Sequence, residues 1–184
     1  PFGSISPTTA GHVSRYFGEN LEVVLDGGEC LKGIESTIIG FEGEQAVLYR
    51  LGSISAEDIE RVVGKLKHHT VDDSAPAAPG MLSRHYAPST ETFLTQDVKE
   101  MVLSHPNKKI GLLIFQENPI SQHVAHTEVL SQKGDLNEAA RNLYAAMHRL
   151  DHLDLDVIIA EELPEEGLGK SINDRLKRAV KKQP

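Results

Sequence analysis

The stretch KKIGLLIF, residues 108–115, decides the fold. Positions 110–115 carry no polar side chain, which is typical of a strand that is buried on both faces of a sheet. The run DVIIAEEL at 156–163 has the same character, and TETFLT at 90–95 and HTEVLS at 126–131 are shorter β-rich runs. We therefore expect four strands of one sheet in this half of the chain.

Segments of helical character alternate with these strands. QDVKEMVLSH (96–105) and GKSINDRLKRAVKK (169–182) predict helices, and DLNEAARNLYAAMHRLDHL (135–153) predicts a long amphipathic helix. The apolar stripe of that long helix consists of Leu136, Ala139, Ala140, Leu143, Met147 and Leu150. Strands that alternate with helices predict a parallel, Rossmann-like α/β layer, which we assign to a small domain at residues 91–184.

Residues 1–70 have a different pattern, which predicts a portion of an α+β domain. LEVVLDGG (21–28) predicts a strand, and the β-rich runs 33–41 and 45–52 predict a hairpin. SAEDIERVVGKLKHH (55–69) opens with a Ser-x-x-Asp capping pattern and predicts a helix. Between the two parts, residues 71–90 are rich in proline and small side chains and predict a linker or a functional loop. The fold class is therefore α/β, in two parts joined by a linker.

Composition restricts the classes of function. The 184 residues carry a net charge of −8, which argues against general coating of nucleic acid. The apolar runs fall short of the roughly 18–20 residues that span a bilayer, so we expect no membrane partner. The single cysteine, Cys30, cannot form an internal disulfide and favours a cytoplasmic protein. Because the first residue is Pro1, we expect a processed chain or a piece of a longer one.

The start of the segment SISPTTAGHVSRYFG (4–18) is the first candidate binding site. Ser6 is a suitable N-cap, Pro7 fits the first helical position, and Gly18 fits the helix end. Free N–H groups and hydroxyls at such a start, including that of Thr8, suit a phosphate or a carboxylate. A plain N-cap is the alternative.

Two further polar residues lie on or beside the predicted hairpin. Ser36 stands among isoleucines in a predicted strand, where its hydroxyl could face a ligand or only contribute to strand formation. Arg50, at the end of the next strand, could bind a phosphate through two N–H groups or remain a surface arginine.

Three other features favour structural explanations. GLGKS (167–171) is similar to a phosphate-binding loop, but Pro164 stands where that motif requires glycine. His148 and His152 have helical spacing without further metal ligands, so we expect a surface pair and no metal site. The basic end of the chain is expected to be a solvated helix, with a contact to RNA as the alternative.

Five stretches together resemble one family. PFGSISPTTAGHV, LDGGECLKGIESTII, YRLGSIS, APGMLSRHYAPS and GLGKSINDRLKRA follow one another in the order seen in long-form threonylcarbamoyl-AMP synthases. That resemblance implies a YrdC-like catalytic domain (here only its C-terminal part, residues 1–70), a linker (71–90) and a C-terminal Rossmann-like domain (91–184). It also implies that an upstream half of the catalytic domain is missing from this sequence.

The resemblance implies a reaction and its partners. L-threonine, bicarbonate and ATP with Mg²⁺ would give threonylcarbamoyl-adenylate and pyrophosphate, and a downstream transferase complex would modify tRNA, which the chain itself would contact only indirectly or weakly. No single catalytic residue is implied. The alternatives are a non-catalytic fragment that binds a nucleotide or RNA, and a stand-alone regulatory domain.

Roles for individual residues follow from the same resemblance. Ser6, Thr8, Arg50 and Tyr86 would bind ATP, and Ser36 would contact L-threonine. Arg84 and His85 would form a lid together with Tyr86, delivered by a proline-stiffened linker. The chain departs from the family at Leu51, where proline is usual, and at Ser83, where an aromatic residue is common.

Overall fold

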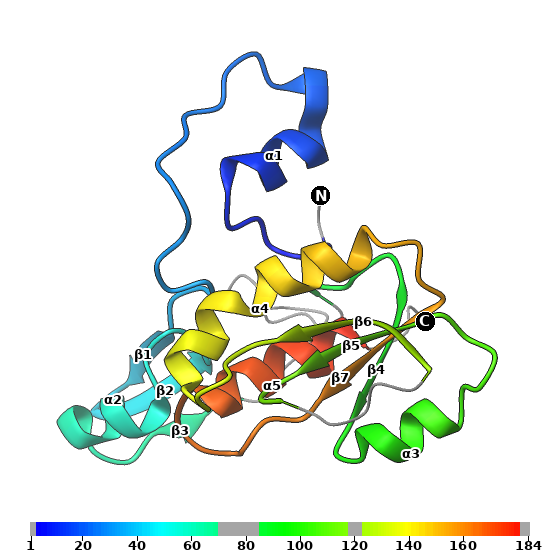
Figure 1. Ribbon diagram of the computed structural model, residues 1–184. Helices are drawn as coiled ribbons and strands as arrows, with labels where there is room; N and C mark the ends of the chain where they lie inside the picture. The colour runs from blue at the N-terminus through cyan, green and yellow to red at the C-terminus, as the bar shows by residue number, and fades with distance from the viewer. Residues whose placement is uncertain (1–2, 70–84, 118–122, 181–184) are drawn as a thin grey trace.

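The computed structural model describes residues 3–69, 85–117 and 123–180. Its larger part is a four-stranded sheet of β4 (Glu91–Thr95), β5 (Ile110–Ile114), β6 (Val124–Val129) and β7 (Val157–Glu161). The strand order is β4-β7-β5-β6 and all three pairings are parallel (Figure 1). The α/β class and the parallel layer predicted from the sequence are confirmed.

Strand β5 shows why its apolar run decides the fold. Ile110, Leu112 and Ile114 pack in one core cluster, whereas Leu113 and Phe115 pack in another. Because side chains of a strand alternate between the faces of a sheet, a strand covered on both faces needs apolar residues at every position.

Helices cover the two faces of this sheet. The long helix α4 (Leu136–Asp151) and α5 (Gly167–Ala179) pack against each other and contribute to the cluster that contains Leu113. Helix α3 (Val98–Leu103) contributes Val98 and Val102 to the cluster that contains Leu112. The apolar stripe expected for 135–153 is confirmed, since most of its members are fully buried.

A smaller mixed sheet lies beside α4 and α5. Strands β1 (Ile38–Glu42) and β2 (Gln45–Arg50) form the expected hairpin, and β3 (Lys67–His68) pairs with β2 in parallel. Helix α2 (Ala56–Val63) begins after Ser55, whose hydroxyl accepts a hydrogen bond from the Asp58 amide as the capping pattern predicts. The helix expected to reach residue 69 ends earlier, because Gly64 takes a positive φ at its C-cap.

The first helix differs from its prediction at its start. Helix α1 (Ala10–Phe17) is capped by Thr9, whose side chain accepts from the His12 amide, so the assignment of Ser6 as N-cap is wrong. The expected end at Gly18 is confirmed, and a short 3-10 turn η1 (Gly18–Asn20) follows. The strand expected at 21–28 is not formed, and its side chains Val23 and Leu25 are exposed, so this segment has neither a pairing partner nor a core to bury them.

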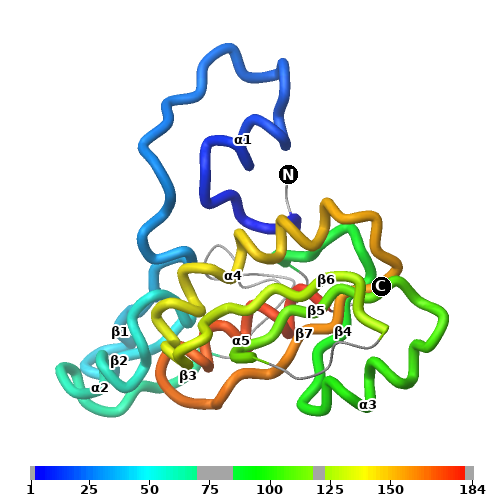
Figure 2. Tube along the Cα trace, in the orientation of Figure 1, coloured from blue at the N-terminus to red at the C-terminus, as the bar shows by residue number. Residues whose placement is uncertain are grey.

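Helix α1 stands apart from the two sheets. It lies above one end of α4, and a long segment without regular structure leads from it down to β1 (Figures 1 and 2). The N-terminal segment and the C-terminal helices nevertheless share one core, since Ile5, Ile34 and Tyr86 pack in the cluster formed around α4 and α5. The boundaries proposed at residues 70 and 90 stay a prediction, and residues 70–84 lie outside the described part of the chain.

Candidate functional site at the junction of the two parts

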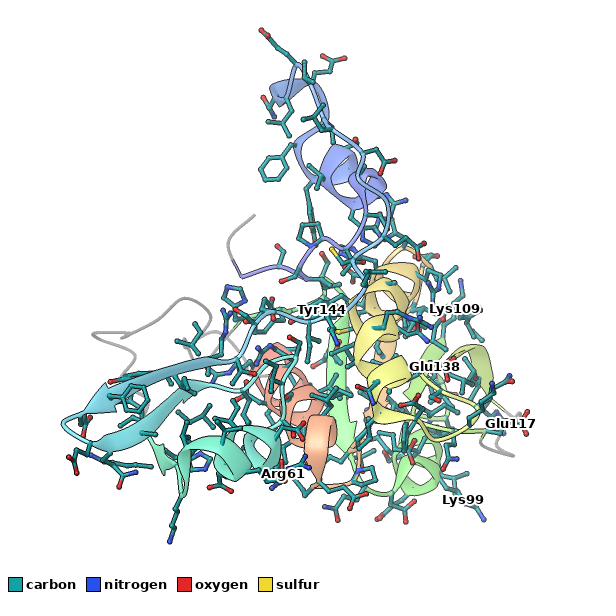
Figure 3. The ribbon with its side chains drawn as sticks, turned by 90° about the vertical axis from the view of Figure 1, so that its left-hand side faces the viewer. Arg61, Lys99, Lys109, Glu117, Glu138 and Tyr144 are labelled. Atoms are coloured by element: carbon teal, nitrogen blue, oxygen red, sulfur yellow. The ribbon has the colours of Figure 1, made fainter. Side chains whose placement is uncertain are left out.

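The carboxylate of Glu35 is the centre of a polar network that joins the two parts of the chain. Ser6 Oγ donates to its Oε1 at 2.8 Å, and the Tyr144 hydroxyl lies 3.2 and 3.0 Å from its two oxygens. Arg175 Nε donates to Oε2 at 3.1 Å. Three segments far apart in sequence therefore hold one side chain, and Figure 3 shows Tyr144 where α4 meets the long segment between α1 and β1.

Arg175, on helix α5, is fully buried within this network. Its Nη2 donates to the Leu51 carbonyl at 2.7 Å, its Nη1 donates to Asp174 at 2.6 Å, and its guanidinium lies 4.9 Å from the centre of the Tyr86 ring. The prediction of a merely solvated C-terminal helix is wrong at this residue, because the helix packs with one basic side chain inward. The charge pattern of the sequence did not predict that the Arg175 side chain is buried.

The end of the linker passes through the same junction. His85 N donates to the Arg178 carbonyl, and Ala87 N donates to the Gly3 carbonyl. Tyr86 lies between them at 1% exposure, its ring 5.5 Å from that of Tyr144, with a positive φ of 62°. A left-handed tyrosine is uncommon and holds only where its surroundings fix it. Arg84, the other expected lid residue, lies outside the described residues.

Ser36 and Arg50 are brought together next to Glu35. Arg50 Nη2 lies 2.9 Å from the Ser36 carbonyl and 3.3 Å from its hydroxyl. Ser36 is exposed and Arg50 half-buried, so both can be reached from solvent. The structure thus brings these two predicted site residues together, although Ser36 lies just before β1 and not within it.

Ser6 and Thr8 border a cavity of about 460 Å³ beside this network. Its lining consists of Ser6, Pro7, Thr8, Tyr144 and the residues from Cys30 to Glu35. The two hydroxyls are brought to one cavity, but not at a helix start, because Ser6 and Thr8 both precede the Thr9 cap. Thr8 is buried, and its hydroxyl lies 3.4 Å from His12 Nδ1.

The charges of the site follow from its burial. Burial acts to raise the pKa of Glu35, but the Arg175 charge and the Ser6 hydrogen bond outweigh it, so the pKa is lowered and the carboxylate is ionised. Burial raises the pKa of Tyr86 above its ordinary value and that of Tyr144 well above it, so both phenols stay protonated and can donate.

The expected surface pair of histidines is wrong at one member. His148 is 2% exposed, stacks on His12 with 3.9 Å between ring centroids, and contacts the Ser6 carbonyl at 3.2 Å. Burial, with the charge of His12 adding to it, lowers the pKa of His148 to about 4. His152 is exposed as expected. The stacked rings of His12 and His148 therefore join α1 to α4.

Sequence reasoning missed Glu35, Tyr144 and Arg175. All three belong to stretches with a recognisable pattern, yet no local rule places an acid before a strand, a tyrosine on an apolar stripe and a helical arginine in one contact. Among residues 3–69, 85–117 and 123–180, no group of three or more potential metal ligands occurs. Within the same residues, no helix is both long and apolar enough to cross a bilayer.

Comparisons with known proteins agree with this architecture. A family model described as "Threonylcarbamoyl-AMP synthase, C-terminal domain" matches residues 54–180. The threonylcarbamoyl-AMP synthase of Pyrococcus abyssi is 37% identical over 96% of this chain and 54% of its own length. That of Bacillus subtilis is 30% identical over 97% of this chain and 54% of its own length. The chain thus spans about half the length of these relatives.

Solved structures share the arrangement of both parts. The crystal structure of P. abyssi Sua5 complexed with L-threonine covers 97% of this chain and 55% of its own, with a TM-score of 0.82 and 34% identity. A variant of the same protein, in which a histidine and the tyrosine after it are replaced by alanine, also covers 97% with a TM-score of 0.82. On this sequence and structural evidence, the chain belongs to the family of threonylcarbamoyl-AMP synthases.

Proposed function

We propose that the chain forms part of the substrate site of an L-threonylcarbamoyladenylate synthase, which is a nucleotidyltransferase. The reaction would join L-threonine, bicarbonate and ATP to give threonylcarbamoyl-AMP and pyrophosphate. Because the chain spans about half the length of its relatives, the proposal assigns turnover to a full-length protein that carries these residues.

The contact between Arg50 and Ser36 beside the Glu35 network carries this proposal. It presents a hydroxyl and a guanidinium together at a solvent-accessible position, next to a cavity lined by further hydroxyls. We assign Ser36 to L-threonine, and a relative with a similar overall fold was solved in complex with that amino acid. Arg50 is assigned to the nucleotide, because a guanidinium can donate two N–H bonds to one phosphate.

The hydroxyls of Ser6 and Thr8 are assigned to the ATP phosphates. ATP would enter as its Mg²⁺ complex, in which the metal neutralises charge on the triphosphate. The chain's own part is to hold both substrates so that a threonine carbamate can displace pyrophosphate from the α-phosphorus. Such chemistry depends mostly on positioning and on electrostatic stabilisation, so it needs no single general base.

The linker residues His85 and Tyr86 are assigned to the closure of this site, with Arg84 as a third member. They form the only adjacent histidine–tyrosine pair in the sequence, and a histidine–tyrosine pair is what the alanine variant of P. abyssi Sua5 replaces. The product would pass to a transferase complex that modifies tRNA in the cytoplasm.

The test is the release of pyrophosphate from ATP, measured with and without L-threonine and bicarbonate. We expect a full-length protein carrying these residues to require both, and to lose at least about tenfold in kcat/KM when Arg50 is changed to methionine. Pyrophosphate release that ignores threonine, or no release at all, contradicts the proposed function.

A non-catalytic fragment that binds a nucleotide or RNA is the alternative function. It predicts that the 184 residues bind ATP or RNA while the full-length protein shows no turnover. Turnover by the 184 residues alone would rule out that alternative.

A further inference from the structure

We propose that Tyr144 and Arg175 are positioning residues for the substrate-binding segments, acting through Glu35 and through the Leu51 carbonyl. Both lie on helices of the C-terminal layer, α4 and α5, and neither is assigned to a substrate above, although Tyr144 also lines the cavity. The inference rests on the proposed function, because it assumes that Ser36 and Arg50 contact substrates.

The Glu35 carboxylate is held by hydrogen bonds at both of its oxygens. Each oxygen of Glu35 has two donors within 3.2 Å, from Ser6 and Tyr144 on Oε1 and from Tyr144 and Arg175 on Oε2. A side chain that is fixed at both oxygens also fixes its own backbone. Ser36 is the next residue, so the position of its hydroxyl depends on two helices of the other part.

The guanidinium of Arg175 contacts three separate segments of the chain. Arg175 contacts Glu35 before Ser36, the Leu51 carbonyl after Arg50, and the ring of Tyr86 in the linker. Glu35 and Leu51 each adjoin a residue assigned to a substrate, and Tyr86 is assigned to the closure of the site. A planar group with several fixed donors can set the distances among such segments, which a single flexible ammonium group cannot do.

A tight backbone contact at Gly52 connects helix α5 with Ser36. Ser171 Oγ, also on α5, donates to the Gly52 carbonyl at 2.9 Å, and both Ser171 and Arg175 are fully buried. The backbone of residues 36–37 lies so close to Gly52 that a Cβ there would come within 2.3 Å of Ser36 C. A movement of α5 is therefore transmitted to residues 51–52 and on to Ser36.

Stability alone does not account for this arrangement. The side chain of Arg175 has 0% exposure and that of Glu35 has 25%, so the pair pays a cost of desolvation. Apolar residues of similar volume often stabilise a protein as well as a buried ion pair does. The property that the polar network adds is fixed geometry, and at this place the geometry is that of the substrate segments.

The experiment compares Tyr144→Phe, Arg175→Lys and the control Arg149→Lys in the full-length protein. Tyr144→Phe removes one hydroxyl and keeps the buried ring, so we expect the KM for threonine to rise about tenfold. The KM for ATP should rise less, because Ser6 keeps its own hydrogen bond to Glu35. Arg175→Lys should raise both KM values, because it also loosens Leu51 and Tyr86. Arg149 forms an ion pair with Glu128 away from this network, and its variant should change neither value.

A double variant separates positioning from a general loss of packing. If Tyr144 acts through Glu35, then Tyr144→Phe should add little to the effect of Glu35→Gln on the KM for threonine. Thermal unfolding of each variant shows how much of any change reflects stability. Should Arg175→Lys fail to fold, Tyr144→Phe carries the test.

The outcomes distinguish this inference from the function on which it rests. Lower thermal stability with both KM values unchanged in Tyr144→Phe and Arg175→Lys would overturn the inference and leave the proposed function intact. An unmodified protein without threonine-dependent turnover would instead remove the proposed function, and the inference with it.

Discussion

Gly52 is a position where a very small substitution should disturb the site. An alanine Cβ there would lie 2.3 Å from Ser36 C and Thr37 N and 2.5 Å from the Glu35 carbonyl oxygen. These are backbone atoms, which cannot turn away as the end of a side chain can. We expect Gly52→Ala to cost about 1–3 kcal/mol of unfolding free energy and to lower activity by displacing Ser36.

The control for Gly52→Ala is Gly27→Ala, where an added Cβ meets no atom within 4 Å and φ is not positive. Urea unfolding followed by circular dichroism measures both variants. Equal stabilities for the two would contradict the close approach of residues 36–37 to Gly52.

The burial of Tyr86 determines what a substitution in the linker should do to folding. A lid residue free in solution could be removed with little effect on folding, but Tyr86 is 1% exposed and packs between Arg175 and Tyr144. We expect Tyr86→Ala to cost about 3–5 kcal/mol of unfolding free energy in addition to its effect on activity. Chemical unfolding of the variant measures that cost, and a loss below about 1 kcal/mol would show that the ring is not part of the core.

Helices α1 and α2 show which parts of an element the sequence can predict. The prediction of the α2 cap is confirmed because Ser55 and Asp58 form hydrogen bonds with each other within one turn. The prediction of the α1 cap is wrong because Ser6, Thr8 and Thr9 are all possible caps. Which of them caps the helix depends on a residue far away in the sequence. Ser6 donates to Glu35, 29 residues away, which leaves Thr9 to cap the helix.

The contact between α1 and α4 should depend on pH. The pKa of His148 is about 4 in the folded protein, below the ordinary histidine value of 6.5, and the pKa of His12 is also lowered by its burial. Between those values the unfolded chain binds a proton that the folded chain does not. The stability from a neutral His148 is therefore complete above pH 6.5 and declines as the pH falls toward 4.

The groups that face the two rings add to this direction. Arg15 on α1 and His152 on α4 lower both pKa values, and Arg149 lowers that of His12. Glu29 acts in the opposite direction at His12, as does the hydrogen bond with the Ser6 carbonyl at His148. We expect the melting temperature to fall between pH 7 and pH 5, and to fall less in His148→Phe, which keeps a ring and cannot be protonated. An NMR titration of His148 with a midpoint near 6.5 would contradict its burial.

At the scale of the whole molecule, the periodicity of apolar residues predicted the sheet. Contacts between residues far apart in the sequence were not predicted. The strands β5 and β7 and the helix α4 were predictable because each has the same neighbouring layers along its length. Their apolar residues therefore follow a regular pattern in the sequence. The junction was not predictable, since Glu35 lies 109 residues from Tyr144 and 140 residues from Arg175 along the chain. Their meeting is set by how two parts dock, and no local pattern encodes that.

The region from α1 to β1 exposes several large apolar side chains. Val23, Leu25 and Leu31 are 74%, 91% and 87% exposed, and Phe17 and Leu21 are about two-fifths exposed. Exposed apolar side chains concentrated in one segment favour association. We expect the 184 residues to self-associate at micromolar concentration, with sedimentation velocity showing species larger than the 20.2 kDa monomer.

Charge substitution tests whether this segment is responsible. Leu25→Glu with Leu31→Glu should shift the sedimentation profile toward the monomer, because two like charges oppose burial of the segment against a second copy. The control is Leu103→Glu on α3, which is 62% exposed and lies in the other part of the molecule. A monomeric unmodified chain, or an equal response to both variants, would show that residues 17–31 do not drive association.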